Sequence, residues 1–487
     1  MRVIYGDEYD KIGLSMSDSQ VVARKWKNIR KHTWIINGII CDVLSTKRKH
    51  PVDIPIFDYK QRFDSLWLEE CLNDLYSAGL QDDKFQLLYN VNSSVAVAVK
   101  TPVGKTERRE IRNSVIQGDV FGPIFCSKQV DTIGQECLEE HKYTFMYKGK
   151  VEIPPLGMVD DLLCVSECGF RTTMLNSYIH FKTNSKKLQF GLAKCKKKHI
   201  GKSYEEHKCQ DLFVDNWPEV QKGDTIEDCF IGEGQMEEAT EEKYLGDIIS
   251  KDGRNMKNIK ARVNKGTGVV TRIMMLLDGM PFGKYYFEIA MILRNCLLVS
   301  SVLNNSEAWY NLTNAELDYL ETVDLMFLRN VLQTPKSTPK EMLYLEFGCV
   351  PFRKIIQKRR MSFLYYILHE DPQSLIYKFF ETQSARRNQK DWVWVTTALK
   401  DIEELDLNLN FDEIKCMKKS SFIDMVKRKI EEKTLEYLNQ KKASHTKVLQ
   451  LKHTKLKMKR YFLPSEAKQK KEESQLILKL RSKTASS

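Results

Sequence analysis

Three carboxylates in the first half of the chain have the types and spacing needed to hold metal ions. Asp160 and Asp161 lie between two short apolar stretches, 153–158 and 162–165, so the sequence predicts a hairpin with both acids at its tip. Adjacent carboxylates repel each other, and cations relieve that repulsion. An Asp-Asp pair is also common in solvated turns, and the pair alone favours that simpler interpretation.

Asp58 is the third carboxylate, and it closes another apolar run, 52–57. Two neighbouring strands would bring the three acids together. Such a cluster suits nucleotidyl transfer, in which two Mg²⁺ ions stabilise the attacking 3′ oxygen and the leaving pyrophosphate. Mg²⁺ takes oxygen ligands and keeps several waters, so a few carboxylates and the substrate phosphates complete its shell. In this hypothesis Asp58 and Asp160 bridge the ions and Asp161 supports them.

Three segments follow one another in the chain: 58–64 (DYKQRFD), 117–123 (QGDVFGP) and 158–161 (MVDD). Their order and residues resemble motifs A, B and C in reverse transcriptases of non-LTR (LINE-like) retrotransposons. Downstream, 190–195 (FGLAKC) resembles motif D of this family, and 244–246 (YLG) with 250–253 (SKDG) resembles its link from palm to thumb. The resemblance covers at least 15–253 and extends towards 369.

The resemblance implies an α+β fold with the right-hand architecture of a polymerase. Residues 1–253 would form partial fingers and a palm, which is an antiparallel sheet backed by helices. Residues 254–375 would form a helical thumb, and 376–487 a charged helical extension with a basic tail.

Local patterns give separate support for helices and strands in these regions. Leu68, Cys71, Leu72 and Leu75 have helical spacing within 67–78. In the thumb region, two segments fit a capping box, and the second has Pro near the helix start. The apolar residues after the first box recur on one helix face. The two boxes are Thr313 to Glu316 and Thr338 to Glu341, and the face comprises Leu320, Val323, Phe327 and Val331.

The resemblance also implies roles for residues around the acids. Phe63 would occupy the space of a ribose 2′-OH and so select deoxynucleotides, although an ordinary core Phe is the alternative. Gln117 and Gly118 would let the nucleotide and template base approach the backbone closely, and a simple Gly/Pro turn is the alternative. Lys194 would lie near the leaving pyrophosphate, but it belongs to a basic run that can also be a solvated surface.

The function implied is RNA-directed DNA polymerase, with an RNA template, a DNA primer, their RNA–DNA duplex and dNTPs as partners. Only the last portion of the family's fingers is recognisable, around 17–20 and 24–30, so we expect an N-terminally shortened enzyme with weak or no activity. One alternative is a catalytically inactive, retroelement-derived nucleic-acid-binding protein. Another is an RNA-templated RNA polymerase, but that class typically carries an acid where this chain has Phe63.

Charge is concentrated at the C-terminal end. The chain has a net charge of +12, from 77 Lys and Arg against 65 Asp and Glu. The tail 441–487 holds 14 basic and three acidic residues, a net of +11, which is nearly the whole imbalance. Basic clusters bind phosphate backbones through counterion release. A solvated, disordered tail is the alternative.

Other patterns bear on location. The longest apolar segment, 290–303, is interrupted by Arg294-Asn295 and Ser300-Ser301, which predicts a buried helix and no membrane partner. Residues 1–8 contain no apolar signal core, so we expect an intracellular protein of the nucleus, the cytoplasm or both. The 12 cysteines are then expected as thiols. They lack the paired CxxC spacing of a zinc knuckle, so we expect no structural zinc.

Overall fold

The computed structural model describes the chain in two compact units. Unit 1 comprises Met1–Gly253 with Pro372–Asp391, and unit 2 comprises Arg254–Asp371 with Trp392–Ser487. Helices and a small sheet occur together, which confirms a mixed α and β class. The residues described are 12, 15–20, 29–45, 51–93, 96–110, 121–140, 143–167, 169–201, 230–231, 234–239, 241–280, 284–386 and 393–443.

This division differs from the three expected domains. Both divisions have a boundary after Gly253. Residues 372–391, however, belong to unit 1, whereas the sequence placed a boundary between thumb and extension at 375. The helix within that segment, α14 (Leu375–Ser384), contributes Phe379, whose ring lies 5.1 Å from that of Trp34 and 4.5 Å from that of Tyr147. Of the remaining C-terminal helices, α17 (Lys419–Ala443) contributes Leu438 to the core of unit 2, and α15 (Trp394–Glu404) and α16 (Phe411–Cys416) contact α13 (Phe352–Leu368).

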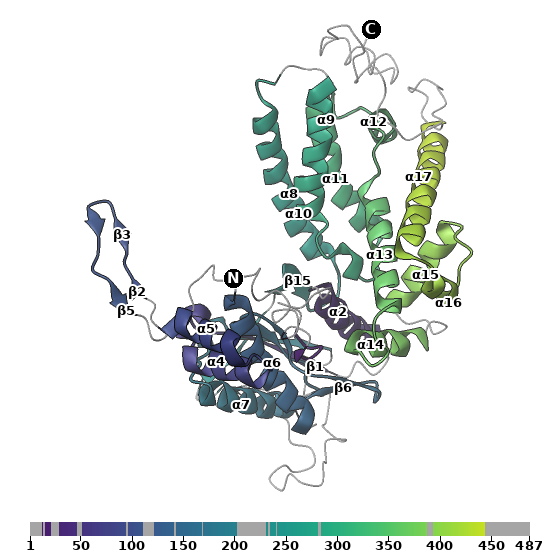
Figure 1. Ribbon diagram of the computed structural model, residues 1–487. Helices are drawn as coiled ribbons and strands as arrows, with labels where there is room; N and C mark the ends of the chain where they lie inside the picture. The colour runs from purple at the N-terminus through teal and green to yellow at the C-terminus, as the bar shows by residue number, and fades with distance from the viewer. Residues whose placement is uncertain are drawn as a thin grey trace. The chain divides into compact units, whose positions relative to one another are not determined.

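A five-stranded sheet organises unit 1 (Figure 1). Its strand order is β13-β10-β1-β9-β8, so β1 is central and has antiparallel partners on both sides. Strand β13 runs parallel to β10 at one edge. The strands are β1 (Val52–Asp58), β8 (Leu156–Met158), β9 (Asp161–Leu163), β10 (Lys196–Ile200) and β13 (Glu237–Glu238).

The central strand is apolar because it is covered on both faces. All residues of β1 from Val52 to Phe57 are buried, and only the terminal Asp58 is half-exposed. A strand buried on both faces lacks the alternation of a surface strand. Helix α7 (Gly169–Ser185) contacts β1, and α6 (Gly122–Glu140) contacts β8.

The predicted helix at 67–78 is confirmed as α4 (Leu68–Ser77), in which Cys71, Leu72 and Leu75 are buried. It packs against α6 and belongs to the main core of unit 1. Other helices of this unit are α2 (Arg30–Ser45), α3 (Arg62–Ser65), α5 (Asp82–Ser93) and the 3₁₀ turn η1 (Leu192–Lys194).

The remaining strands of unit 1 form two-stranded pairs outside the five-stranded sheet. Two of these pairs, β2 with β5 and β3 with β4, form the two short ladders of an exposed hairpin. The pairs are β2 (Ala96–Val97) with β5 (Arg109–Glu110), β3 (Lys100–Thr101) with β4 (Gly104–Lys105), β6 (Phe145–Tyr147) with β7 (Val151–Ile153), β11 (Phe230–Ile231) with β12 (Gly234–Gln235), and β14 (Glu241–Tyr244) with β15 (Asp247–Ser250).

Unit 2 is helical throughout its described part, with one apolar core. Helix α11 packs against α8, and α17 packs against α12 and α13. The elements are α8 (Met256–Leu277), α9 (Lys284–Leu293), the π-helical turn η3 (Arg294–Val299), α10 (Ser300–Val302), η4 (Ser306–Ala308), α11 (Asn314–Leu332), α12 (Lys340–Phe347), α13 (Phe352–Leu368), α15 (Trp394–Glu404), α16 (Phe411–Cys416) and α17 (Lys419–Ala443).

One of the two predicted capping boxes is confirmed. The Thr313 hydroxyl accepts the backbone N–H of Glu316, whose carboxylate accepts the backbone N–H of Thr313. The predicted apolar face of this helix is also buried. The box at Thr338 is wrong, because α12 begins at Lys340 with Pro339 as its N-cap and no side-chain cap. Pro339 has an extended ψ of 136° and lies before the first helical residue, so Thr338 and Glu341 lose the spacing that a capping box requires.

The apolar segment around 290–303 lies in a helix long and apolar enough to cross a membrane, Tyr285–Val302, of which 39% is buried within the protein. Core helices of soluble proteins satisfy the same criteria. Ala290, Leu298 and Val302 of this helix belong to the core of unit 2.

Candidate active site

The sheet brings Asp58 and Asp161 directly opposite each other. The register of β1 and β9 pairs Ile56 with Leu163 and Asp58 with Asp161. Residues that face each other across antiparallel strands have Cβ atoms about 5 Å apart. Two acids distant in the sequence thus lie side by side at one end of the central strand.

Asp160 lies in the adjacent turn. Strands β8 and β9 pair Met158 with Asp161, which leaves Val159 and Asp160 as a two-residue loop. Asp160 is exposed, whereas Asp161 and Asp58 are half-exposed. The predicted hairpin with acids at its tip is confirmed.

Val159 has an unfavourable backbone conformation in this turn. Its φ is +56°, in the left-handed region that glycine adopts most easily and a β-branched residue rarely adopts. Such conformations cost roughly 1–3 kcal/mol and occur mainly at functional sites, where the surrounding structure enforces them. The turn therefore holds the acids at the expense of local backbone strain.

The three carboxylates influence one another electrostatically. The pKa of Asp161 is raised from 3.8 to about 6, first by partial burial and then by the negative charges of Asp160 and Asp58. A carboxylate with like-charged neighbours resists ionisation unless a cation compensates it. Excess negative charge is therefore concentrated at this end of the sheet.

Lys194 approaches the same carboxylates from η1. Its Nζ lies 3.4 Å from Oδ1 of Asp58, and its side chain is 72% exposed. The backbone fixes this approach, because the N–H of Gly191 donates to the Asp58 carbonyl oxygen at 2.8 Å. The sequence hypothesis placed Lys194 near the reacting phosphates, and the structure brings its ammonium group to Asp58.

Phe63 lies in the first helical turn after β1. Its side chain is half-exposed and packs against the main core of unit 1. Burial and a role at the nucleotide are thus compatible, since one side of the ring contacts the core and part remains accessible.

Arg62 is a neighbour that the sequence hypothesis did not include. It is 97% buried, with its guanidinium 4.3 Å from the centre of the Tyr59 ring. Nη2 donates to the Cys126 carbonyl oxygen at 3.0 Å, while Nε and Nη1 have no partner among the described residues. This contact links the segment after Asp58 to α6. In the sequence, Arg62 is recognisable only as a charged residue directly before Phe63.

Tyr244 is a second missed neighbour. It is fully buried, and its pKa is raised well above the usual value by burial and by the negative charge of Asp161. Its hydroxyl donates to the Leu156 carbonyl oxygen at 3.4 Å and lies 3.4 Å from Nδ1 of His32. Tyr244 thus connects the β14–β15 hairpin to β8. The sequence hypothesis used it only as a family landmark.

The segment 17–20, expected as a remnant of fingers, lies against the strand that leads into the acidic turn. The Ser19 carbonyl oxygen accepts the Gly157 N–H at 2.9 Å, and the Ser17 N–H donates to Asp131 at 2.8 Å. A Cβ on Gly157 would lie 2.6 Å from Nε2 of Gln20 and 2.8 Å from Cγ1 of Val130. Gly157 is therefore required by close packing.

Several predicted residues lie outside the described part of the chain. They are Gln117 and Gly118, the basic residues among 24–28, and the basic tail after residue 443.

The donor set has the chemistry that Mg²⁺ prefers. The described residues contain no group of three or more His, Cys, Asp or Glu side chains arranged to hold a metal. Mg²⁺ seldom needs such a cage, because it binds through one or two carboxylates, substrate phosphates and several waters. Adjacent, partly exposed carboxylates with an excess of negative charge fit this mode of binding.

No protein-family model and no curated protein matches the chain. Solved structures to which it is similar include three of telomerases from two Candida species. The Candida albicans enzyme, bound to a fragment of telomeric RNA, is 14% identical with a TM-score of 0.35, and the match covers 87% of this chain and 55% of that one. The Candida tropicalis enzyme with the same kind of RNA fragment is 11% identical (TM-score 0.39; 88% and 56% covered). Its apo form is also 11% identical (TM-score 0.36; 78% and 60% covered).

The chain spans between about half and two thirds of the length of these telomerases. TM-scores below 0.5 at such low identity do not identify an activity. The case for function therefore rests on the carboxylate site.

Proposed function

We propose that the chain is an RNA-directed DNA polymerase of the non-LTR retrotransposon type, with unit 1 as its palm. One observation carries this proposal: Asp58 and Asp161 are direct cross-strand partners, and Asp160 occupies the adjacent turn. The resemblance of the three motifs supports it. The fingers and thumb assignments are part of the proposal.

In this proposal Asp58, Asp160 and Asp161 hold two Mg²⁺ ions, which would stabilise the developing charge on the attacking and leaving oxygens. The strained turn at Val159 keeps Asp160 beside Asp161 before substrate arrives. Such preorganisation lowers the barrier because little rearrangement is needed during the reaction.

Lys194 neutralises charge on the departing pyrophosphate. Among the described residues its exposed ammonium group contacts Asp58 alone, at 3.4 Å, so phosphate oxygens can compete for it. Phe63 restricts the space beside the sugar and disfavours ribonucleotides. Gln117 and Gly118 are proposed to contact the nucleotide and template.

The proposed substrates are an RNA template, a DNA primer and dNTPs. A catalytically inactive nucleic-acid-binding protein is the alternative that the assay must distinguish.

Primer extension on an RNA template with dNTPs and Mg²⁺ tests the proposal. We expect extension by the natural sequence and a loss of at least 1,000-fold in Asp160→Asn, because a displaced metal removes several kcal/mol of transition-state stabilisation. Asp83→Asn, which changes an exposed acid in α5 of the same unit, is the matched control and should extend normally.

No extension at any dNTP concentration, together with retained RNA binding, would favour the inactive alternative. Extension unchanged by Asp160→Asn would contradict the metal assignment. Offering NTPs tests Phe63 separately: the natural sequence should reject them, and Phe63→Ala should incorporate them more readily.

A further inference from the structure

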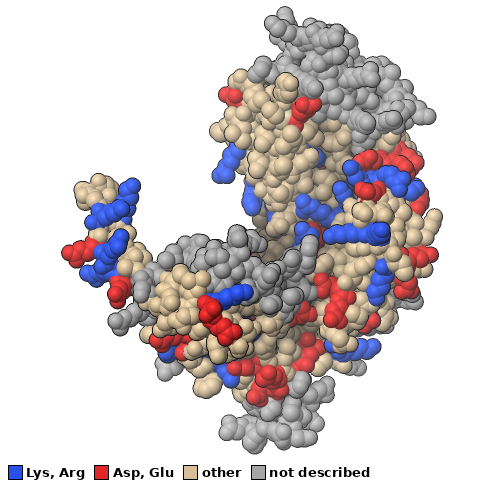
Figure 2. Space-filling view, viewed as in Figure 1, with Lys and Arg blue, Asp and Glu red and all other residues tan. Residues whose placement is uncertain are grey.

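The hairpin 96–110 in unit 1 stands apart from the five-stranded sheet and carries a concentration of charge. Strand β2 pairs with β5 and strand β3 pairs with β4, and none of the four pairs with another described strand (Figure 1). It holds four cations, Lys100, Lys105, Arg108 and Arg109, against two acids, Glu107 and Glu110. All six side chains are exposed, and Figure 2 shows blue side chains gathered along this hairpin.

The hairpin has an ordered backbone. The Thr106 N–H donates to the Val99 carbonyl oxygen at 3.0 Å, and the Val99 N–H donates to the Thr106 hydroxyl at 2.9 Å. Val97 and Lys100 are three positions apart in the first arm of the hairpin, whereas their partners Arg109 and Lys105 are four positions apart in the second. The second arm therefore contains one extra residue, which is a β-bulge. Bulges twist a ribbon and redirect its side chains.

The cross-strand register sets two like charges against each other. Lys100 is the direct partner of Lys105. Like charges at this position destabilise a hairpin. In the described part of the chain no ion pair involves any of the hairpin's four cations. No described residue therefore compensates the repulsion, and an anionic partner would relieve it.

The hairpin also exposes apolar surface. Val103 at the tip is 97% exposed and Val99 is 59% exposed. An isolated two-stranded hairpin is marginally stable in water because it buries little. The exposed cations and valines of this hairpin therefore gain no stabilisation from packing against the rest of unit 1.

We propose that hairpin 96–110 is a nucleic-acid-binding arm that contacts the phosphate backbone independently of sequence. The identity of the partner rests on the proposed function of unit 1, and the charge complementarity comes from the four cations, which form no ion pair with any residue that the structure describes. A two-stranded ribbon is narrow enough to follow a groove or a strand. A membrane partner is less well matched, because the tip between Thr101 and Gly104 offers a single exposed valine and one proline.

Fluorescence anisotropy tests the arm without requiring catalysis. The full chain is titrated into a labelled single-stranded RNA and into an RNA–DNA hybrid of the same sequence, at several KCl concentrations. The test variant combines Lys100→Gln, Lys105→Gln, Arg108→Gln and Arg109→Gln. We expect roughly 10- to 100-fold weaker binding and a salt dependence shallower by up to about three log units per log unit, because each phosphate contact contributes about 0.7–0.9.

Two variants serve as controls. Glu107→Gln with Glu110→Gln raises the hairpin's charge and should strengthen binding several-fold, which a merely damaged hairpin would not do. Lys418→Gln, Lys419→Gln, Lys427→Gln and Arg428→Gln remove the same charge from exposed positions in and next to α17 of unit 2 and should weaken binding far less. Circular dichroism should be unchanged, since the hairpin pairs only with itself.

Equal loss in the hairpin and α17 variants would overturn the proposal, because it would show a general charge effect. RNA binding unchanged by the hairpin variant would also overturn it, as would hairpin-dependent binding to vesicles containing phosphatidylserine but not to RNA. Loss of extension in Asp160→Asn with intact binding concerns the proposed function alone, so the two failures are distinguishable.

Discussion

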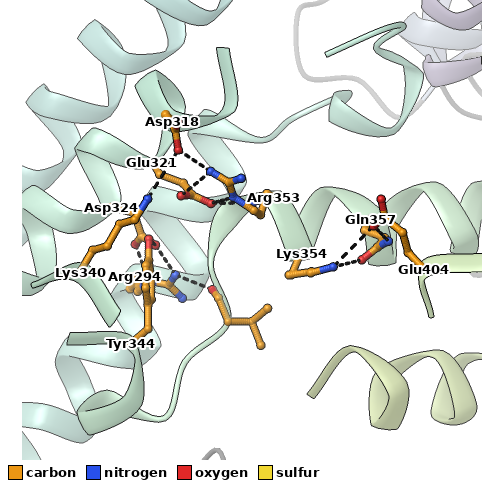
Figure 3. Close-up of polar contacts among 11 residues, drawn as sticks. Arg294, Asp318, Glu321, Asp324, Lys340, Tyr344, Arg353, Lys354, Gln357 and Glu404 are labelled. Carbon is orange, nitrogen blue, oxygen red and sulfur yellow. Dashed lines mark hydrogen bonds and ion pairs between the residues drawn. The ribbon is translucent and has the colours of Figure 1, made fainter. Parts of the chain in front are cut away.

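The acidic end of the unit 1 sheet and the polar core of unit 2 differ in how their carboxylates are paired with cations. In unit 1, three carboxylates gather with one exposed lysine nearby. In unit 2, the buried carboxylates of Asp324, Glu321 and Asp401 are each paired with a guanidinium group. Arg294 donates to both oxygens of Asp324 at 2.7 and 2.6 Å, and both side chains are almost fully buried (Figure 3).

The unit 2 network continues to the helix surface. Arg353 donates to Glu321 at 2.7 Å and to Asp318 at 2.6 Å (Figure 3). Burial opposes the charge on Arg294, yet the carboxylate of Asp324 raises the pKa of that guanidinium above its usual value. The charges of Arg294 and Arg353 in unit 2 therefore serve structure, because each guanidinium lies against a carboxylate. At the end of the unit 1 sheet, three acids outnumber the one lysine that contacts them among the described residues, and a perturbed carboxylate of this kind is typical of functional sites.

The largest expected effect on stability follows from breaking the buried pair. Asp324→Asn should lower the free energy of unfolding by about 3–5 kcal/mol, because it leaves the buried Arg294 charge uncompensated. Chemical denaturation measures this change. Asp318→Asn is the control, since its carboxylate is 57% exposed and should contribute less than about 1 kcal/mol. Equal losses in both would show that the network is not organised by burial.

The exposed Lys194–Asp58 pair of unit 1 should affect the reaction rate and leave stability almost unchanged. Lys194→Gln should change the free energy of unfolding by less than about 0.5 kcal/mol, because surface ion pairs contribute little. The rate of primer extension should fall roughly 10- to 100-fold through loss of charge at the pyrophosphate. Lys187→Gln is the control, because it disrupts an exposed pair with Glu70 in the same unit and should leave the rate unchanged. A stable variant with full activity would remove Lys194 from the site.

A smaller effect is expected from the partial burial of Asp161 and the like charges beside it. Because the pKa of Asp161 is raised from 3.8 to about 6 on folding, the folded chain binds more protons than the unfolded chain between these pH values. The free energy of unfolding should therefore fall as pH rises through this window. In the presence of a chelator, Asp161→Asn should be more stable than the natural sequence by about 1 kcal/mol at pH 7.5, with solvent screening allowed for.

At pH 3.5 the same substitution should have little effect, because Asp161 is then largely protonated in both states. Asp83→Asn should show no such pH dependence. A natural sequence that is more stable than Asp161→Asn at pH 7.5 would mean that a cation of the protein compensates the site.

The sequence predicted the acidic site through local patterns. The apolar run before Asp58 became β1, and the runs around Asp160 became β8 and β9. The proximity of Asp58 to Asp161 followed because the hypothesis placed both at the ends of neighbouring strands. Helix starts were predicted where cap spacing was regular, as at Thr313, and failed where Pro339 displaced the start.

Long-range packing could not be predicted in this way. The contact between the rings of Phe379 and Trp34 depends on shape complementarity between segments far apart in the chain. The burial of Arg62 against Cys126 and of Tyr244 near Asp161 likewise has no periodic signature. Charge pairing such as Arg294 with Asp324 is visible only after the helices pack.

The central claim is that three carboxylates share one cation site, and Mn²⁺ binding followed by electron paramagnetic resonance tests it most directly. Titration of the full chain with Mn²⁺, with primer–template and dNTP present, counts the bound ions without requiring turnover. We predict that Asp58→Asn and Asp160→Asn each weaken binding at least 10-fold, whereas Asp83→Asn binds like the natural sequence. Mn²⁺ binding unchanged by Asp58→Asn would contradict the account, because Asp58 would then lie outside the site that Asp160 and Asp161 form.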